Sequence, residues 1–373
     1  MSHDKVSVAW GDEVTVRCVI LPPFVLCLAA VLAASQATHP ALVPAQPAAG
    51  HRILLDVVVT DKSGKPISGL QEQDFTILDD KTPAKITSFH ASEPTEPSDP
   101  PVQAIILVDG VNASIQSVIF ETQQLQKFLR QNNGQLPLPM SLAIFSDASQ
   151  QMQPESTRDG NVLADGLGAN QPGLRSLRRS AGFWGASERL QLSLQTLERI
   201  TRYEEGRPGR KLLLWISPGW PLLSGPSIQL TNRDERMLFN SVVDFSRQLR
   251  DARVTLYSID PLGTGDAGSF RAFYYQSFLK GVPNARKVDS GNLALQVLAT
   301  QSGGMVLNSS NDLQKLLAAP LGDAKAFYTL SFDAPPADHP DEYHALQVKV
   351  DKPGLSARTR TGYYAQPYPT TVH

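Results

Sequence analysis

Four predominantly apolar runs constrain the fold of this chain more than any other feature. They are QAIILV at Gln103–Val108, MSLAIF at Met140–Phe145, KLLLWI at Lys211–Ile216 and VTLYSI at Val254–Ile259. Runs of this kind are typical of strands that are buried on both faces, as in a parallel sheet. They therefore predict a sheet whose two faces are both covered.

Amphipathic segments separate these runs. Apolar residues recur at helical spacing in Ser114–Arg130, Leu190–Tyr203 and Arg233–Arg250, and a further helix is expected at Leu293–Gln301. Strands that alternate with helices indicate an α/β domain with a mainly parallel sheet covered by helices on both faces. We place this domain at residues 102–322.

Two segments that flank the α/β domain have strand character. Residues 53–92 begin with ILLDVVVT, and residues 323–365 contain three short runs of β-type residues. Each segment is too short to form a stable sheet by itself. We therefore expect the two segments to combine into one accessory β-sandwich beside the α/β domain.

The N-terminus has the features of an export signal. Arg17 precedes the apolar run VILPPFVLCLAAVLAA, and Ser35-Gln36-Ala37 offers small residues where a signal peptidase cuts. We expect a signal peptide at 1–37, a linker rich in Pro and Ala at 38–52, and export to the periplasm, the cell envelope or the outside. If the signal stays uncleaved, that segment is the expected membrane contact.

The cysteine content and the net charge argue against disulfides, thiolate metal sites and nucleic-acid partners. The two cysteines, Cys18 and Cys27, both lie in the N-terminal apolar segment, so cleavage would leave a chain without disulfides or thiolate metal ligands. The formal net charge is -2, which provides no broad basic field for nucleic acid. We therefore predict no nucleic-acid partner.

Polar side chains follow each of the four apolar runs. Asp109, Asp147, Ser217 and Asp260 come directly or almost directly after them. In open parallel sheets, ligands bind outside the carboxyl ends of the strands, and carboxylate and hydroxyl oxygens suit Mg²⁺ or Ca²⁺. The same residue types also cap the free N–H groups of a following turn or helix, so both interpretations remain open.

Several longer strings carry a family resemblance. They include LLDVVVTDKSGKPISGLQEQDFTILDD, AIILVDG, RKLLLWISPG and LATQSGGMVLNSSNDL. Together they resemble the VWFA-related proteins typical of Acidobacteria, which carry a von Willebrand factor type A-like domain, and the resemblance covers about residues 53–365. It implies a three-layer α/β/α Rossmann-like domain.

The resemblance also implies where a metal site would lie. Type A domains bind Mg²⁺ through Asp-x-Ser-x-Ser, a Thr from a later loop and an Asp after the fourth strand. In this chain those positions fall on Asp109, Val111, Ala113, Ser187 and Pro218. Since a lone carboxylate and one hydroxyl are poor ligands for Mg²⁺, we predict a degenerate site with no tightly bound metal and no other cofactor.

A rearranged metal site remains an alternative to the degenerate one. Asn112, Ser114, Asp147 and Asp260 supply oxygens near the same strand ends, and they could hold Mg²⁺ or Ca²⁺ in a different arrangement.

The sequence favours a binding module over an enzyme. The seven histidines show no metal-ligand spacing, and Ser217 lacks the first glycine of a nucleophile elbow. We predict an exported, non-catalytic protein that presents its strand-end rim to a protein or peptide partner. The alternatives are a metal-dependent adhesion domain and a hydrolase based on carboxylates. The predicted rim consists of Asp109, Asn112, Asp147, Trp184, Ser217, Trp220 and Asp260.

Overall fold

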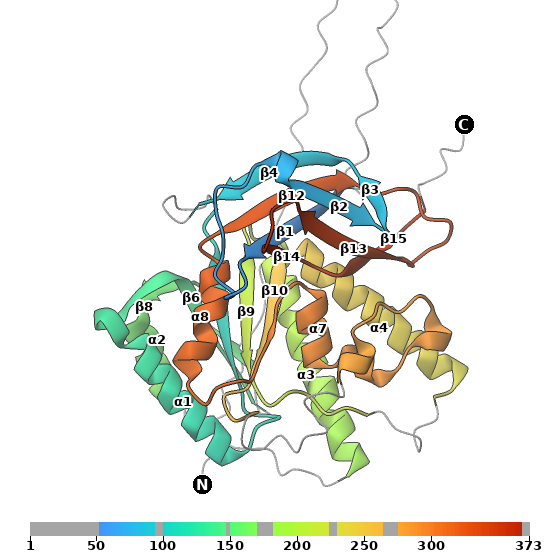
Figure 1. The fold of residues 1–373 in the computed structure, drawn as a ribbon. Coiled ribbons are helices and arrows are strands. Elements are labelled where there is room, and N and C mark those ends of the chain that lie inside the picture. Colours follow the sequence, from blue (N-terminus) through green and yellow to red (C-terminus); the bar gives the residue numbers. More distant parts are fainter. Residues whose placement is uncertain are drawn as a thin grey trace, which may run out of the picture. The chain divides into compact units, whose positions relative to one another are not determined.

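A mainly parallel sheet forms the centre of the α/β domain in the computed structural model (Figure 1). Five parallel strands lie in the order β11-β10-β9-β5-β6, and β7 and β8 pair with β6 in the antiparallel sense. The structure describes residues 52–93, 100–146, 150–169, 182–223, 230–263 and 275–367. The expected signal peptide and nearly all of the expected linker lie outside these residues.

The elements of this domain follow the predicted alternation. They are β5 (Gln103–Asp109), α1 (Ile115–Leu129), β6 (Gln135–Phe145), β7 (Gln150–Met152), β8 (Thr157–Asp159), α2 (Gly160–Ala169), α3 (Phe183–Glu205), β9 (Lys211–Ile216), α4 (Asn232–Asp251), β10 (Val254–Ile259), α7 (Leu295–Gln301), β11 (Val306–Leu307) and α8 (Leu313–Asp323), with the 3-10 helices η2 (Gln131–Gly134), η4 (Tyr275–Phe278), η5 (Ala285–Lys287) and η6 (Ser290–Leu293).

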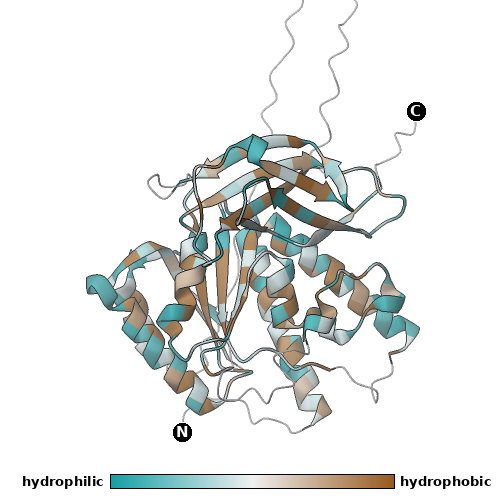
Figure 2. Cartoon of the chain, viewed as in Figure 1, coloured by the Kyte–Doolittle hydropathy of each residue, from teal (hydrophilic) through white to brown (hydrophobic). Residues whose placement is uncertain are grey.

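Helices cover both faces of the sheet, so the domain has three layers. Helices α1, α2 and α8 bury their apolar residues against one face, and α3, α4 and α7 pack on the other. Every residue of β9 and β10 is buried, as expected for strands between two helical layers. Figure 2 shows the resulting concentration of hydrophobic residues in the central strands. The predicted α/β fold class is confirmed.

The two flanking segments do build a composite β-sandwich. β1 pairs with β12 and β14, and β2 pairs with β13, so both sheets combine strands from both ends of the chain. The sheet orders are β14-β1-β12-β4 and β15-β13-β2-β3. The strands are β1 (Arg52–Thr60), β2 (Phe75–Asp79), β3 (Thr82–Ala84), β4 (Ile86–Ser92), β12 (Phe327–Asp333), β13 (Glu342–Val350), β14 (Ser356–Arg358) and β15 (Gly362–Ala365), with the 3-10 helix η1 (Glu72–Asp74) before β2.

Apolar and aromatic side chains from both sheets share one core. Leu55, Tyr328 and Leu330 from one sheet are buried together with Ile77 and Val348 from the other. The rings of Phe75 and Tyr328 lie 4.9 Å apart across this interface, which is a favourable aromatic contact. The sandwich therefore depends on chain segments that are separated by the whole α/β domain.

Charged side chains and hydroxyls connect the sandwich to the α/β domain. Arg253, which precedes β10, forms an ion pair with Asp56 of β1. Arg358 of β14 pairs with Asp323 at the end of α8, and the Tyr257 hydroxyl donates a hydrogen bond of 2.7 Å to the same carboxylate. Asp323 is 2% exposed, so this network is a buried part of the joint.

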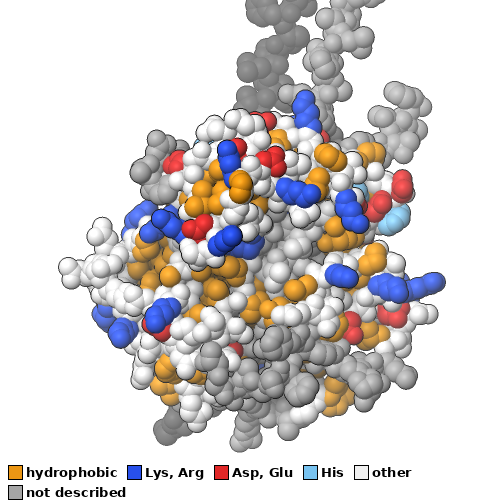
Figure 3. Space-filling view, in the orientation of Figure 1, with side chains coloured by type: hydrophobic (Ala, Val, Ile, Leu, Met, Phe, Trp, Pro, Cys, Tyr) orange, Lys and Arg blue, Asp and Glu red, His pale blue; other side chains and the backbone are white. Residues whose placement is uncertain are grey.

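Within the described residues, no helix combines the length and the apolar character needed to cross a bilayer. On the face seen in Figure 3, Lys and Arg side chains are interspersed with Asp and Glu.

Candidate functional site

The order of the strands locates a candidate site at their carboxyl ends. β5 lies between β6 and β9, so the chain leaves β5 toward one side and later returns on the other. Ligands of open α/β sheets bind at such a switch point. Val108 is in register with Ile216 in the adjacent strand, and this register brings the next residues, Asp109 and Ser217, to the same edge.

Hydrogen bonds from within the chain occupy both oxygens of the Asp109 carboxylate. Oδ1 accepts from the backbone N–H groups of Val111 and Asn112, each at 2.9 Å. Oδ2 accepts from Asn112 Nδ2 at 2.8 Å and from the Trp215 indole N–H at 2.9 Å. The nearby Ser217 hydroxyl also favours the charged form of this carboxyl group and so lowers its pKa. Asp109 therefore fastens the turn after β5 to the core.

Burial sets the electrostatics of this carboxyl group. Asp109 is 0% exposed. Burial raises the pKa of the Asp109 carboxyl, while the hydrogen bonds from Asn112, Trp215 and Ser217 oppose that rise. The donors are those expected around a charged carboxylate, so they replace the water that burial removes.

The other positions of a type A metal site do not supply a suitable ligand set. Val111 and Ala113 are 2% and 1% exposed, and both belong to the apolar cores. Pro218 is half-buried and has no side-chain oxygen, and Ser187 is a half-buried residue of α3. Since the Asp109 oxygens already accept hydrogen bonds from four internal donors, the described residues do not fit Mg²⁺ at this position.

Two predicted rim residues belong to the core instead of the surface. Trp220 is 4% exposed, and its ring packs edge-on against Trp215 with the centroids 5.0 Å apart. Ser217 is 0% exposed and accepts a hydrogen bond from the Gly219 N–H. Gly219 has a φ of 102°, which lets the chain turn back and bury both residues. Ser217 and Trp220 are therefore buried, as is Asp109, and these three members of the predicted rim do not lie on the surface.

The remaining rim residues have different environments. Asn112 is half-buried and donates to Ser193 of α3 as well as to Asp109. Asp260 is half-buried, and its Oδ1 accepts from the N–H of Leu262. Trp184 is 81% exposed. Asp147 lies outside the described residues.

Exposed apolar side chains surround this end of the domain. Helices α1, α3 and α4 each begin at the carboxyl edge of the sheet, because each precedes a strand that starts at the opposite edge. Five of the six exposed large hydrophobic residues in the described part of the chain lie within the first two turns of these helices. We call this set the apolar collar; it consists of Ile115, Ile119, Phe183, Trp184 and Met237.

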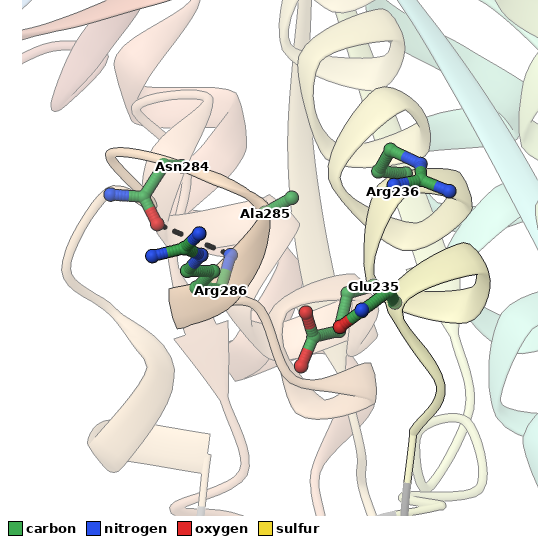
Figure 4. A pocket seen from close by; sticks show the side chains of 6 residues that line it. Glu235, Arg236, Asn284, Ala285 and Arg286 are labelled. Carbon is green, nitrogen blue, oxygen red and sulfur yellow. Dashed lines mark hydrogen bonds between the residues drawn. The ribbon is translucent and has the colours of Figure 1, made fainter.

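A groove beside the first turn of α4 carries two arginines (Figure 4). Its volume is about 490 Å³, and its lining includes Arg236 of α4 and Arg286 of η5. Glu235 faces the same groove, while Asn284 Oδ1 accepts from the backbone N–H of Arg286. The groove is therefore polar, and the apolar Met237 lies next to it in sequence.

Glu121 is a buried acid that the sequence analysis did not identify. It is 1% exposed, and neither carboxylate oxygen has a hydrogen-bond partner. Burial raises the pKa of Glu121 well above its ordinary value, and the negative charges of Asp109 and Asp260 add to the rise. Its spacing from Val118 and Leu125 on the sheet-facing stripe of α1 was the available signal. Because both oxygens are sealed from solvent, a substrate cannot reach them.

A second polar cluster lies in the sandwich. His344 Nδ1 is 2.9 Å from Asp79 Oδ1 and 3.5 Å from Asp80 Oδ2. The Tyr363 hydroxyl donates to Asp79 Oδ2, and the backbone N–H of Ala345 donates to Asp80 Oδ1. These bonds join the turn after β2 to β13 and β15. The cluster was not predicted, because the histidine and the aspartates are far apart in the sequence.

Comparisons with known proteins do not assign this chain to a family. No family model matches the sequence, and no curated protein matches it. Among solved structures, the human COPII-coat protein Sec24c is similar at a TM-score of 0.34 and 10% sequence identity. That match covers 74% of this chain and 46% of Sec24c, so the chain spans less than half the length of Sec24c.

Proposed function

We propose that this chain is an exported, non-catalytic protein-binding module whose α/β domain is of the von Willebrand factor type A kind with a degenerate metal site. The strand order and the aspartate at the switch point support this assignment, together with the family resemblance of the sequence. In this proposal, a protein or peptide binds at the carboxyl edge of the sheet.

The apolar collar is the observation that carries the proposal. Trp184 is 81% exposed and Phe183 is 50% exposed, and their rings contact each other edge-on with centroids 5.8 Å apart. Large exposed aromatic residues are unfavourable in water and are enriched at protein interfaces. A partner that covers Phe183 and Trp184 would remove this apolar surface from water.

The groove beside α4 suggests what else the partner carries. Arg236 and Arg286 present two guanidinium groups that can bind a carboxylate through paired hydrogen bonds. A segment with an apolar side chain and a nearby acidic group would therefore match this edge of the domain. Its carboxylate would bind arginine, not a metal ion.

Site-specific cross-linking tests the proposal. A photoreactive phenylalanine analogue replaces Trp184 in the collar or, as the control, Val162, which is 53% exposed on α2. Both variants are irradiated with the envelope fraction of the source cells, once with Mg²⁺ and once with EDTA. We expect a discrete adduct from position 184 in both buffers and none from position 162.

Each arm of this experiment addresses one alternative. An adduct that disappears in EDTA would support a metal-dependent adhesion domain. The same faint adducts from both positions would show that the collar has no partner in that fraction. In the expected case, replacing both Arg236 and Arg286 by Ala weakens the adduct at position 184.

A further inference from the structure

A buried arginine that forms no ion pair with any described residue lies between the sandwich and the α/β domain. Arg360 follows β14, and the turn after α7 holds this segment in place through a hydrogen bond from Thr361 N to Gln301 O. Gly303 in the same turn has a φ of 89°, and a side chain there would collide with the backbone of Thr359 and Arg360. The close approach explains how Arg360 comes to be 8% exposed.

Arg360 borders two small cavities at this joint. One has a volume of about 20 Å³ and the other about 10 Å³, and Ser302 lines both. A space of this size holds one water molecule or one small ion. Among the described residues, none forms a side-chain hydrogen bond or an ion pair with Arg360. The side-chain N–H donors of Arg360 are therefore available to whatever occupies these cavities.

The neighbouring charges leave one positive charge unbalanced. The smaller cavity is also lined by Arg250, Arg253 and Asp56. Arg253 pairs with Asp56, and Arg250 pairs with Asp251 at 3.0 Å. The two aspartates thus neutralise two of the three arginines, and Arg360 is the third.

Burial of Arg360 destabilises the charged form of its guanidinium group, and this lowers its pKa. Burial lowers the pKa of Arg360 to about 10, and the nearby Arg250 adds to the effect. At neutral pH the guanidinium group is nevertheless charged. A buried charge needs a partner of opposite sign or a full set of hydrogen bonds.

We propose that the cavities around Arg360 bind one small monovalent anion of the chloride type, which links the β-sandwich to the α/β domain. The single unpaired guanidinium matches one negative charge, and the cavity volumes match a monatomic ion. Larger anions such as gluconate are too bulky to enter.

Thermal unfolding of the full chain measures this binding. The melting temperature is recorded in mixtures of sodium chloride and sodium gluconate at constant ionic strength. An ion that binds only the folded state raises the melting temperature by roughly 2–4 °C for each tenfold increase in its concentration above half-saturation. We expect this rise for the unchanged chain and for Arg199→Met, an exposed control on α3, and no rise for Arg360→Met.

Crystals of the unchanged chain grown in sodium bromide provide a second readout that needs no variant. We expect one anomalous bromide peak within hydrogen-bonding distance of the Arg360 guanidinium group. An ordered water alone at this place would overturn the proposal, as would a chloride effect that Arg360→Met retains or that gluconate reproduces.

Discussion

At Asp109, hydrogen bonds within the chain occupy both carboxylate oxygens and leave them unavailable to a metal ion. Backbone N–H groups, an amide, an indole and a hydroxyl surround its two oxygens. Removing the carboxylate would leave several buried donors without a partner, and each such donor destabilises the folded state by about 1–3 kcal/mol. Asp109 is therefore a structural residue at the switch point of the sheet.

Asp109→Ala should lower the free energy of unfolding by about 3 kcal/mol or more, because the Trp215 indole and the turn after β5 lose their acceptor. Urea denaturation measures the loss. Asp165→Ala is the matched control, since Asp165 is exposed and pairs with Arg130 alone among the described residues, and it should change stability by less than about 1 kcal/mol. Equal effects of the two variants would contradict the structural role.

Glu121 should make the protein less stable as the pH rises. Its pKa is raised in the folded state, so its contribution to stability is complete below the ordinary pKa of glutamate. That contribution is lost as the pH increases through the higher folded-state pKa. Glu121→Met removes the unpaired oxygens, and we expect it to stabilise the protein by about 1–3 kcal/mol at pH 7.

The gain from Glu121→Met should shrink toward pH 4, where the acid is protonated in both states. Denaturant unfolding at a series of pH values follows this difference. A gain that is constant with pH would show that Glu121 has the same pKa in the folded and unfolded states, which would contradict the raised pKa.

The sequence predicted the location of some residues of the candidate site but not the burial of others. The location of Asp109 followed from the end of an apolar run, because strand ends can be read from hydrophobicity. The burial of Ser217 and Trp220 could not be read in this way, since it depends on how the chain turns at Gly219. Glu121 was missed because its burial depends on the packing of α1, which sequence spacing only suggests.

At the scale of elements, long periodic segments were predicted best. The strands at Lys211–Ile216 and Val254–Ile259 begin and end at the predicted residues. The helix predicted at Leu190–Tyr203 extends to Phe183–Glu205, because its first turns expose apolar residues and do not follow the buried stripe. The short strands β7 and β8 were missed, since three residues carry too little pattern.

Lys211 joins three elements of the α/β domain. It is 1% exposed, and its Nζ donates to the carbonyl oxygens of Glu204, Arg207 and Ala252, which lie at the ends of α3 and α4. The Glu204 carbonyl also accepts from the backbone N–H of Arg207, and the ammonium group supplies further donors to the carbonyls at both helix ends.

Lys211→Met should therefore reduce the free energy of unfolding by about 2 kcal/mol or more. Equilibrium unfolding in urea gives the value, and Lys127→Met on the exposed face of α1 is the control. If both variants behave alike, Lys211 does not stabilise the helix ends.

At the scale of the whole molecule, the two ends of the chain complete one sandwich. β1 lies between β12 and β14, so its pairing partners come from residues more than 250 positions away. The sequence indicated this arrangement because neither β segment could bury enough surface by itself. The strand pairing and register could not be predicted, since they depend on contacts between distant segments.

A chain that ends at Lys325 lacks β12 to β15 and should lose the sandwich. β1 would expose Ile53, Leu55 and Val57, which are otherwise buried. We expect rapid proteolysis within residues 52–93 and fast amide exchange in β1. A chain that ends at Pro367 keeps every described strand and should resist proteolysis. Protection of β1 in the shorter chain would contradict the composite sandwich.

Isothermal titration with Mg²⁺, Mn²⁺ and Ca²⁺ tests most directly whether the carboxyl edge of the sheet lacks a metal site. Because internal donors occupy both oxygens of Asp109, and Val111, Ala113 and Pro218 offer no side-chain oxygen, we predict no micromolar binding to the full chain. Micromolar binding that Asp109→Ala abolishes, with the variant still folded by circular dichroism, would contradict this account.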